Sequence, residues 1–323
     1  NLNHRVYGNC QAPIKMFLEK RGEEFEQNSV LKNLFLMGSS KNYGDVMTTL
    51  TAMSGFEPVG ENGAYPLDGM QEGYQKFLKY QTWKDSFSVS KEMIEDGKLL
   101  DMRKQPAAFM TSYNRTRELF GAALYGAAMM GNGSVTFKGV KFDLTGADGS
   151  NLFAKEHVPK VSGDKQCNLF KDAFSVDTLG KLETKMHLFR GDNDEILDVA
   201  PDTILIPENA DLKKAVFAAI GADKDPVSAN NAFNYQYGRW NVIVWPYLNH
   251  YVTNGVSPWV LLDSKYNETY GGAVWNDRIQ LEVRSTIDEN TDANVWRGRS
   301  RFNACFNDWR FAAIGGIAAG NSL

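Results

Sequence analysis

The sequence has few cysteines, few histidines and little net charge, and each shortage argues against a class of protein. Cys10, Cys167 and Cys305 lie far apart, and no CxxC pair occurs. Neither a zinc knuckle nor a disulfide framework is therefore predicted, and reduced or buried thiols fit a protein assembled in the cytoplasm. The 4 histidines are also scattered, so none has a second His or Cys at metal-ligand spacing.

Charge and hydropathy exclude two further classes. Lys and Arg number 35 against 39 Asp and Glu, which gives a formal net charge of −4. A dedicated nucleic-acid binder concentrates basic charge until its pI exceeds about 9, so the balance argues against one, although a shell wall that tolerates DNA is compatible with it. No apolar run approaches the roughly 18 residues that span a bilayer. The longest, 119–130, is interrupted by Gly121 and Gly126 and predicts a buried helix.

Motifs of catalysis and cofactor binding are missing as well. The chain has no GxSxG elbow, P-loop, HExxH or GxGxxG, so we predict no catalytic, cofactor-binding or metal-binding residue and no enzyme activity. The acidic segment 192–198 lacks the spacing and the terminal Glu of an EF-hand loop, which favours a solvated loop. For His157, packing within a loop is the simpler interpretation.

The first 88 residues divide in two. Residues 1–54 are mixed and polar, with helices expected over 14–25 and 45–53. Residues 55–88 are rich in Gly and Pro between the predicted strands 75–79 and 82–89, which indicates a long, open β-hairpin that projects from a body. Since an extended hairpin cannot bury both of its faces, it needs a partner to lie on.

A long helical stretch follows. Ser90 is the predicted N-cap, and Pro106 marks either a kink or a fresh first turn. Apolar residues then recur at helical spacing up to a stop near Gly131. The apolar stripe comprises Phe109, Tyr113, Phe120, Leu124, Ala127 and Ala128, and the opposite face carries Asn114, Arg115 and Glu118.

The rest of the chain reads as an α/β region followed by long strands. Residues 134–275 mix both kinds of element, and prolines bracket a compact strand at 203–206. Other strands are expected at 135–142, 241–246 and 259–262, and helices at 176–189 and 211–220. From 276 the pattern alternates, and a third segment is expected at 308–314. Alternation places Arg297, Arg299 and Arg301 on one face of a strand.

Two groups of side chains are candidates for contacts between subunits. Large rings on a projecting hairpin do little for a monomer but anchor an interface well, so an interface is favoured over a satellite core within the subunit. The three arginines pair with carboxylates of a neighbouring strand or subunit, form a wet face, or contact phosphates, in that order of preference. The ring candidates are Phe56, Tyr65, Tyr74, Phe77 and Trp83.

The order of these segments resembles the Hong Kong 97-type fold of tailed-phage major capsid proteins. The passage 87–96 (FSVSKEMIED) is similar to the one that often joins hairpin and spine helix in that family. The pieces 148–153 (DGSNLF) with His157, 201–207 (PDTILIP) and 259–263 (WVLLD), and the closing run 279–309, look like the Mu-type major head subunit group. The resemblance implies an α+β fold with five parts: an N-terminal arm (1–54), an extended hairpin loop (55–88), a spine helix (89–133), an axial domain (134–275), and peripheral strands with the C-terminus (276–323).

What the resemblance implies for function is a structural subunit that assembles with itself. Pentamers and hexamers would close into an icosahedral shell around double-stranded DNA, which the wall contacts weakly and without specificity. Expected partners are a portal protein, a scaffold or maturation protease, and a decoration protein, with assembly in the host cytoplasm and no membrane. The first residue, Asn1, fits a protease-trimmed mature subunit. The nearest alternative is an encapsulin-type nanocompartment shell, and an α/β enzyme or a tail protein is further away.

Overall fold

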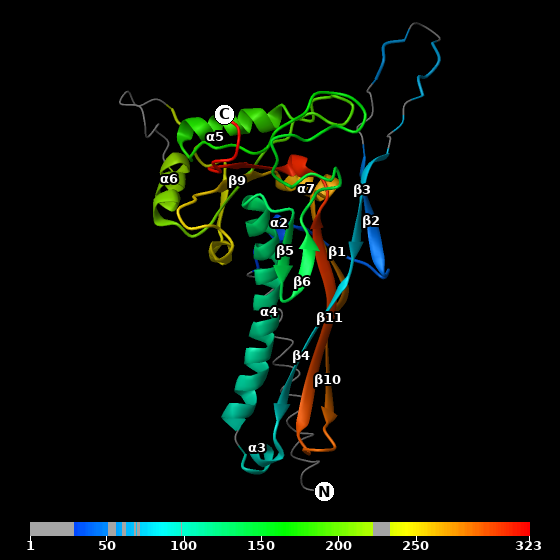
Figure 1. The fold of residues 1–323 in the computed structure, drawn as a ribbon, viewed down its shortest axis with the longest axis vertical. Helices are drawn as coiled ribbons and strands as arrows, with labels where there is room; N and C mark the ends of the chain where they lie inside the picture. The colour runs from blue at the N-terminus through cyan, green and yellow to red at the C-terminus, as the bar shows by residue number, and fades with distance from the viewer. Residues whose placement is uncertain are drawn as a thin grey trace.

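The computed structural model describes residues 29–50, 56–59, 63–67, 69, 72–97, 99–221 and 233–323, without the side chains of 50 and 99–103. It is a mixed α+β structure. A long helix lies along a long sheet, and a second sheet with its helices forms a lobe at one end (Figure 1). Among the described helices, none combines the length and hydropathy that crossing a bilayer needs. The helix expected over 14–25 lies outside the described residues.

The helical stretch begins as predicted. The short helix α3 (Lys91–Glu95) is capped by Ser90, whose hydroxyl accepts a hydrogen bond from the Met93 amide at 3.2 Å. Helix α4 (Leu99–Met129) follows and continues through Pro106, so no new helix begins there. It ends where Gly131 adopts φ +79°, a left-handed conformation that glycine tolerates without steric cost.

Helix α4 packs on a four-stranded sheet in the order β1-β10-β11-β4. The long strands β10 (Ala273–Ile287) and β11 (Asn294–Phe306) are antiparallel, and β4 (Gln81–Val89) pairs with the far edge of β11. The short strand β1 (Leu36–Ser39) lies parallel to β10. Phe120 of the helix is fully buried against the sheet, with its ring 5.4 Å from that of Trp275 and 6.0 Å from that of Phe302.

The predicted apolar stripe of α4 is buried at Phe109, Phe120 and Leu124. The opposite face was expected to be exposed to solvent, but two of its polar residues are buried. Asn114 and Glu118 are only 8% and 5% exposed. The reason is that residues 29–35, including helix α2 (Leu31–Leu34), cover this side; a Cβ on Gly121 would lie 2.4 Å from Leu31. A covering segment so distant in sequence leaves no periodic signal in the helix itself.

The projecting hairpin exists, but its strands are β2 (Gly44–Leu50) and β3 (Glu72–Lys79), paired antiparallel with Val46 opposite Phe77. The helix expected over 45–53 was therefore wrong. The pairing expected within 55–88 was wrong too, because β4 follows β3 after Tyr80 alone and joins β11 instead. A hairpin turn needs at least two residues, so one connecting residue cannot reverse the chain.

The second sheet has the order β12-β9-β7-β8. Strand β7 (Thr203–Ile206) lies inside it between the parallel β8 (Asn241–Val244) and the antiparallel β9 (Trp259–Leu262), and all its residues are buried, as the flanking prolines predicted. The helices are α5 (Val176–His187), α6 (Ala210–Ile220) and α7 (Ser264–Tyr270), with single turns at η1 (Pro246–His250) and η2 (Trp309–Phe311).

Two predicted strands differ from the structure. The expected strand 135–142 is a hairpin, β5 (Ser134–Phe137) and β6 (Val140–Asp143), because Lys138 and Gly139 take φ +48° and +81° and form a tight turn. Strand β12 (Ala312–Gly315) pairs with β9, so the end of the chain returns to the second sheet rather than to the long strands with which 276–323 was grouped.

Candidate assembly surfaces

The hairpin of β2 and β3 extends from the body as a finger (Figure 1), and several of its apolar side chains are exposed. Phe56 and Tyr65 are 110% and 99% exposed, as open as a side chain can be. Leu67 is equally open, and Val46 and Phe77, which face each other across the strand pair, are also exposed. We call this set of side chains the hairpin surface. Its rings have no partner among the described residues, although large rings gain most from burial.

The base of the hairpin is held firmly by the body. The ammonium of Lys76 lies 2.6 Å from the Asp143 carboxylate and 2.7 Å from the Thr145 carbonyl oxygen. Burial would raise the pKa of Asp143, but its hydrogen bonds from Lys76 and Thr145 hold that pKa below its ordinary value. The ammonium of Lys160 donates to the Gly73 carbonyl at 2.6 Å. The finger is therefore anchored at its base and open toward its tip.

Two of the rings assigned to an interface are placed differently. Trp83 stacks on Phe302 with 4.9 Å between centroids, and its indole N–H donates to the Phe302 carbonyl at 3.2 Å. The Tyr74 hydroxyl donates to the Val158 carbonyl at 3.2 Å, and its ring lies 5.7 Å from the Lys160 ammonium. For these two residues the structure favours the alternative of packing within the subunit.

The three arginines of β11 lie on the face of the long sheet turned away from α4. The register places Arg297 between Arg284 of β10 and Ser86 of β4, and Arg299 between Glu282 and Lys84. We call Lys84, Arg284, Arg297, Arg299 and Arg301 the arginine face. A groove of about 700 Å³ crosses it and is lined by Lys84, Asp85, Ser86, Glu282, Arg284, Thr286, Arg297, Gly298 and Arg299.

Charge on the arginine face is poorly compensated. The one ion pair that its side chains make in the described part of the chain is between Arg284 and Glu282, at 3.9 Å with both groups largely exposed. Arg297 and Arg299 are exposed and unpaired there, and the partly buried Arg301 has an Nε without a hydrogen-bond acceptor. Like charges directly opposite each other in a sheet are destabilising, so this arrangement costs the isolated subunit a little.

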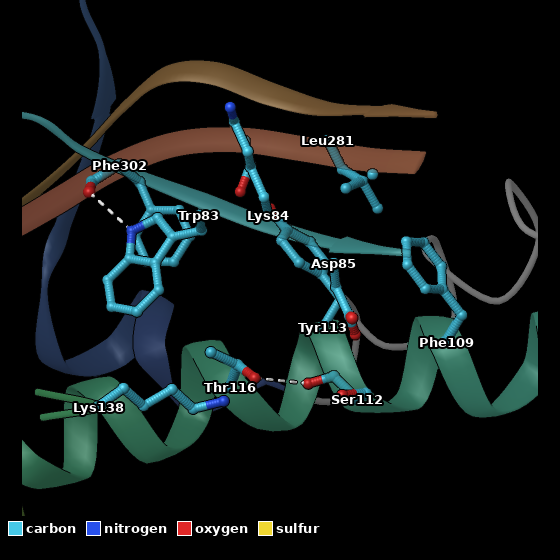
Figure 2. Close-up of a pocket in the computed structure, with 12 residues that line it drawn as sticks. Trp83, Lys84, Asp85, Phe109, Ser112, Tyr113, Thr116, Lys138, Leu281 and Phe302 are labelled. Carbon is cyan, nitrogen blue, oxygen red and sulfur yellow. Dashed lines mark hydrogen bonds between the residues drawn. The ribbon is translucent and has the colours of Figure 1, made fainter. Parts of the chain in front are cut away.

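On its other face, the sheet and α4 enclose a pocket of about 220 Å³ (Figure 2). Rings of Trp83, Phe109, Tyr113 and Phe302 line it together with the buried Ser300, whose hydroxyl has no hydrogen-bond partner among the residues that the structure describes. The Thr116 hydroxyl in this lining donates to the Ser112 carbonyl oxygen at 2.8 Å (Figure 2). Within the described residues no group of His, Cys, Asp and Glu side chains is arranged to hold a metal ion.

The acidic segment 192–198 forms ion pairs with arginines of its own subunit. Asp192 is 4% exposed and lies 2.9 Å from a terminal nitrogen of Arg310, which also contacts Asp308 at 3.2 Å. Burial alone would lower the pKa of Arg310, but the carboxylates of Asp308 and Asp192 raise it above its ordinary value. Asp194 pairs with Arg190 at 3.1 Å, outside this cluster. For Asp192, the expected solvated loop was therefore wrong.

A second buried network surrounds His157, for which packing within a loop was the expected role. Its Nδ1 lies 2.7 Å from the Asp148 carboxylate and its Nε2 lies 2.9 Å from the Asn168 amide oxygen. The ring stacks on Trp309 with 4.1 Å between centroids. This network and that of Arg310 tie the segments around Asp148, His157 and Asp192 to the turn η2 near the C-terminus. The sequence around it, KEHVPK, carries no pattern that indicates this network.

Comparison with known proteins gives the family and the fold. The sequence model of the phage capsid protein family matches residues 74–315. A capsid structure of the cyanophage P-SCSP1u has a TM-score of 0.54 at 10% identity, covering 91% of this chain and 89% of that one. A structure from Mycobacterium phage Patience has a TM-score of 0.51 at 13% identity, covering 97% and 89%. Among curated proteins, none matches the sequence. The predicted α+β fold is confirmed, and the Hong Kong 97-like arrangement is consistent with these neighbours.

Proposed function

Because the chain belongs to the phage capsid protein family, we propose that it is the major head subunit of a tailed bacteriophage, of the Hong Kong 97 type and nearest the Mu-type group. A structural shell protein in the virion is what the family establishes. The finer proposal is that pentamers and hexamers of this chain close into an icosahedral shell around double-stranded DNA. Its role is structural rather than catalytic.

The observation that carries the proposal is the uncovered hairpin surface. Phe56 and Tyr65 are fully exposed on a finger whose base is anchored by Lys76 and Lys160. An anchored finger with open rings is suited to lie on another copy, because burial of those rings then contributes to assembly rather than to folding.

Such a contact joins two different surfaces of identical subunits. Contacts of this head-to-tail kind generate closed rings when the rotation between copies closes, as in pentamers and hexamers. Each subunit is then held by several weak contacts that must break together, so the shell is stable without any strong one. Expansion of a rounded precursor would repack these contacts by rigid-body movement.

The parts of the chain receive roles in this proposal. The arm (1–54) would reach neighbours, and the extended loop (55–88, with β2 as its second strand) would cover an adjacent copy. The spine helix (89–133) and the long strands of 276–323 would form the periphery, and 134–275, joined by β12, would surround the capsomer axis. A portal protein, a scaffold or maturation protease, a decoration protein and weakly held DNA complete the partners, with assembly in the host cytoplasm.

The test is deletion of the hairpin tip, Gly60–Gly69, in cells that produce the chain with the other head proteins of its phage. The wild type should yield closed shells in negative-stain electron microscopy. The deletion should yield a folded, soluble subunit without stable shells. As a matched control, replacing the same ten positions by Gly and Ser keeps the finger at full length. Normal shells from the deletion variant would contradict the role of the hairpin. Wild-type shells that enclose protein, or that contain no DNA, would favour a nanocompartment.

A further inference from the structure

The pocket between α4 and the long sheet leaves space in an interface where Phe120 is fully buried. Close-packed protein interiors leave few voids larger than a water molecule. The volume of this pocket is about 220 Å³, and an apolar protein cavity of roughly 150 Å³ is known to hold a benzene molecule. The space is therefore large enough for a small organic molecule, and we call it the ring pocket.

Aromatic rings form the walls of the ring pocket from two directions (Figure 2). Phe109 and Tyr113 come from α4. Trp83 of β4 and Phe302 of β11 come from the sheet, and their rings stack with 4.9 Å between centroids. Trp83 and Tyr113 are only partly buried by the subunit, so part of each ring is left uncovered. Such walls favour a flat aromatic occupant, because rings gain most from burial and pack well against other rings.

Hydroxyl groups add a polar side to the ring pocket. Ser112 and Thr116 line it from α4, and the Thr116 hydroxyl is already engaged with the Ser112 carbonyl oxygen. Ser300 lines it from β11 and is 1% exposed, yet its hydroxyl has no hydrogen-bond partner among the described residues. A buried hydroxyl without a partner is unfavourable, and an acceptor on an occupant of the pocket would supply the missing hydrogen bond.

Charged groups lie at the rim of the ring pocket. Asp85 and Lys138 line it but are exposed to solvent, and neither forms an ion pair within the described part of the chain. Both groups therefore keep most of their hydration. Because their charges are opposite, the rim as a whole prefers neither an anion nor a cation, and the occupant that fits is uncharged.

We propose that the ring pocket binds a small, flat, uncharged aromatic molecule that carries one hydroxyl group, of the chemical class of phenol. The ring of this ligand would lie against Trp83 and Tyr113, and its oxygen would accept a hydrogen bond from Ser300. The ligand would contact α4 and the sheet at once, so binding would stabilise the folded subunit. The site lies within one subunit and is independent of the proposed role in a shell.

Water is the competing occupant. Ordered water needs about two to four polar partners, whereas apolar cavities stay dry and accept apolar ligands. In the ring pocket the Thr116 hydroxyl is already engaged, and four aromatic rings form much of the wall. A hydroxyl group on an aromatic ring matches this mixture of surfaces better than water, which has no apolar part.

The test is titration of the unassembled subunit with phenol and with toluene, followed by calorimetry. The two probes have nearly the same size, and only phenol carries a hydroxyl group. Phenol should bind to one saturable site with a Kd on the order of 1 mM, within reach of a ligand of about seven non-hydrogen atoms. Ser300→Ala should weaken phenol about fivefold relative to toluene. Comparing this ratio between the two proteins cancels the difference in hydration between the probes.

A second variant tests the place of binding. Thr116→Phe fills the ring pocket and should remove the binding of both probes. Arg115→Phe is the matched control, since Arg115 is exposed on the same helix and does not line the pocket, and it should leave both Kd values unchanged. Thermal unfolding of each variant shows whether it folds. Should Thr116→Phe not fold, the phenol-to-toluene ratio of Ser300→Ala decides alone.

Three outcomes would overturn the proposal. The first is a subunit without saturable phenol binding, whose pocket then holds only water. The second is a phenol-to-toluene ratio that Ser300→Ala leaves unchanged. The third is phenol binding that persists in a folded Thr116→Phe variant, because the ligand would then lie elsewhere. None of these outcomes depends on whether the chain forms shells.

Discussion

Arg310 and Arg299 carry the same guanidinium group in opposite situations. Arg310 is 5% exposed and contacts the carboxylates of both Asp192 and Asp308. Arg299 is exposed on the long sheet, opposite Lys84 and Glu282, and forms no ion pair with the part of the chain that the structure describes. The first arginine is fully used inside the subunit, whereas the second is left available outside it.

The difference separates charges that serve folding from charges that, under the proposed function, serve assembly. A guanidinium taken out of water is tolerable only when carboxylates and carbonyls replace its hydration, so Arg310 belongs to the folded subunit. A row of unpaired exposed cations contributes nothing to the subunit alone. We therefore expect substitutions in the two groups to change different measurements.

The largest effect should come from Arg310→Met. The apolar side chain would leave the carboxylates of Asp192 and Asp308 buried without their cation, which lowers the free energy of unfolding by about 3–5 kcal/mol. Urea unfolding of the unassembled subunit measures this. Arg299→Met is the matched control and should change stability by no more than about 0.5 kcal/mol. Equal losses for the two variants would remove the distinction between them.

A smaller loss should follow His157→Phe. The ring would keep its stack on Trp309, but the Asp148 carboxylate and the Asn168 amide oxygen would each lose contact with an imidazole nitrogen, and Asn168 would keep the hydrogen bond from the Ala154 amide. Loss of the imidazole from this buried polar network should lower the free energy of unfolding, measured in urea, by about 2–3 kcal/mol. His187→Phe is the control, since His187 is 36% exposed and its partner Asp198 is largely exposed, while the buried Glu183, at 3.8 Å from His187, keeps its contact with Arg239. A stable His157→Phe variant would show that stacking alone carries this network.

Local patterns predicted the elements that depend on nearby residues. Strand β7 lies between two prolines, and α3 begins at Ser90 because its hydroxyl caps the helix. Pairing over long distances could not be predicted this way. Strand β2 looked helical because its partner β3 is more than twenty residues away, and only that pairing makes it a strand.

The candidate surfaces show the same limit. Alternation placed Arg297, Arg299 and Arg301 on one side of a strand, and the register confirms a common face. Whether a ring lies open or covered depends on the rest of the fold, so Trp83 could not be told from Tyr65 by sequence. The role of these residues between subunits stays a prediction.

For the arginine face itself, we expect Arg299→Glu to weaken assembly more than Arg299→Ala, and mainly at low salt. Reversal adds repulsion of approaching carboxylates, whereas truncation only removes attraction, and each exposed pair contributes about 0–1 kcal/mol. Light scattering during assembly at about 0.05 M and 1 M salt separates them, because salt screens the repulsion. Subunit unfolding should not change. Equal effects of both substitutions would favour the interpretation of a wet face without a partner.

The smallest effect should come from Glu118→Gln, which tests a buried carboxyl group that accepts a hydrogen bond but forms no ion pair within the described part of the chain. Glu118 is 5% exposed and accepts a hydrogen bond from the Ser29 hydroxyl, and burial raises the pKa of its carboxyl group. The folded state therefore binds more protons than the unfolded state, so the stability of the wild type falls as pH rises from about 4.3 toward that raised pKa.

Gln keeps the acceptor for Ser29 and removes the charge. We expect Glu118→Gln to raise the free energy of unfolding at pH 7 by less than about 1 kcal/mol, the scale of one hydrogen bond. Below about pH 4.3 the advantage should disappear, because the wild-type carboxyl is then protonated in both states. Urea unfolding at the two pH values measures the difference. An advantage of Glu118→Gln that is equal at the two pH values would mean that Glu118 is not a desolvated charge. Glu118 would then not be an intermediate case between the buried, paired Arg310 and the exposed, unpaired Arg299.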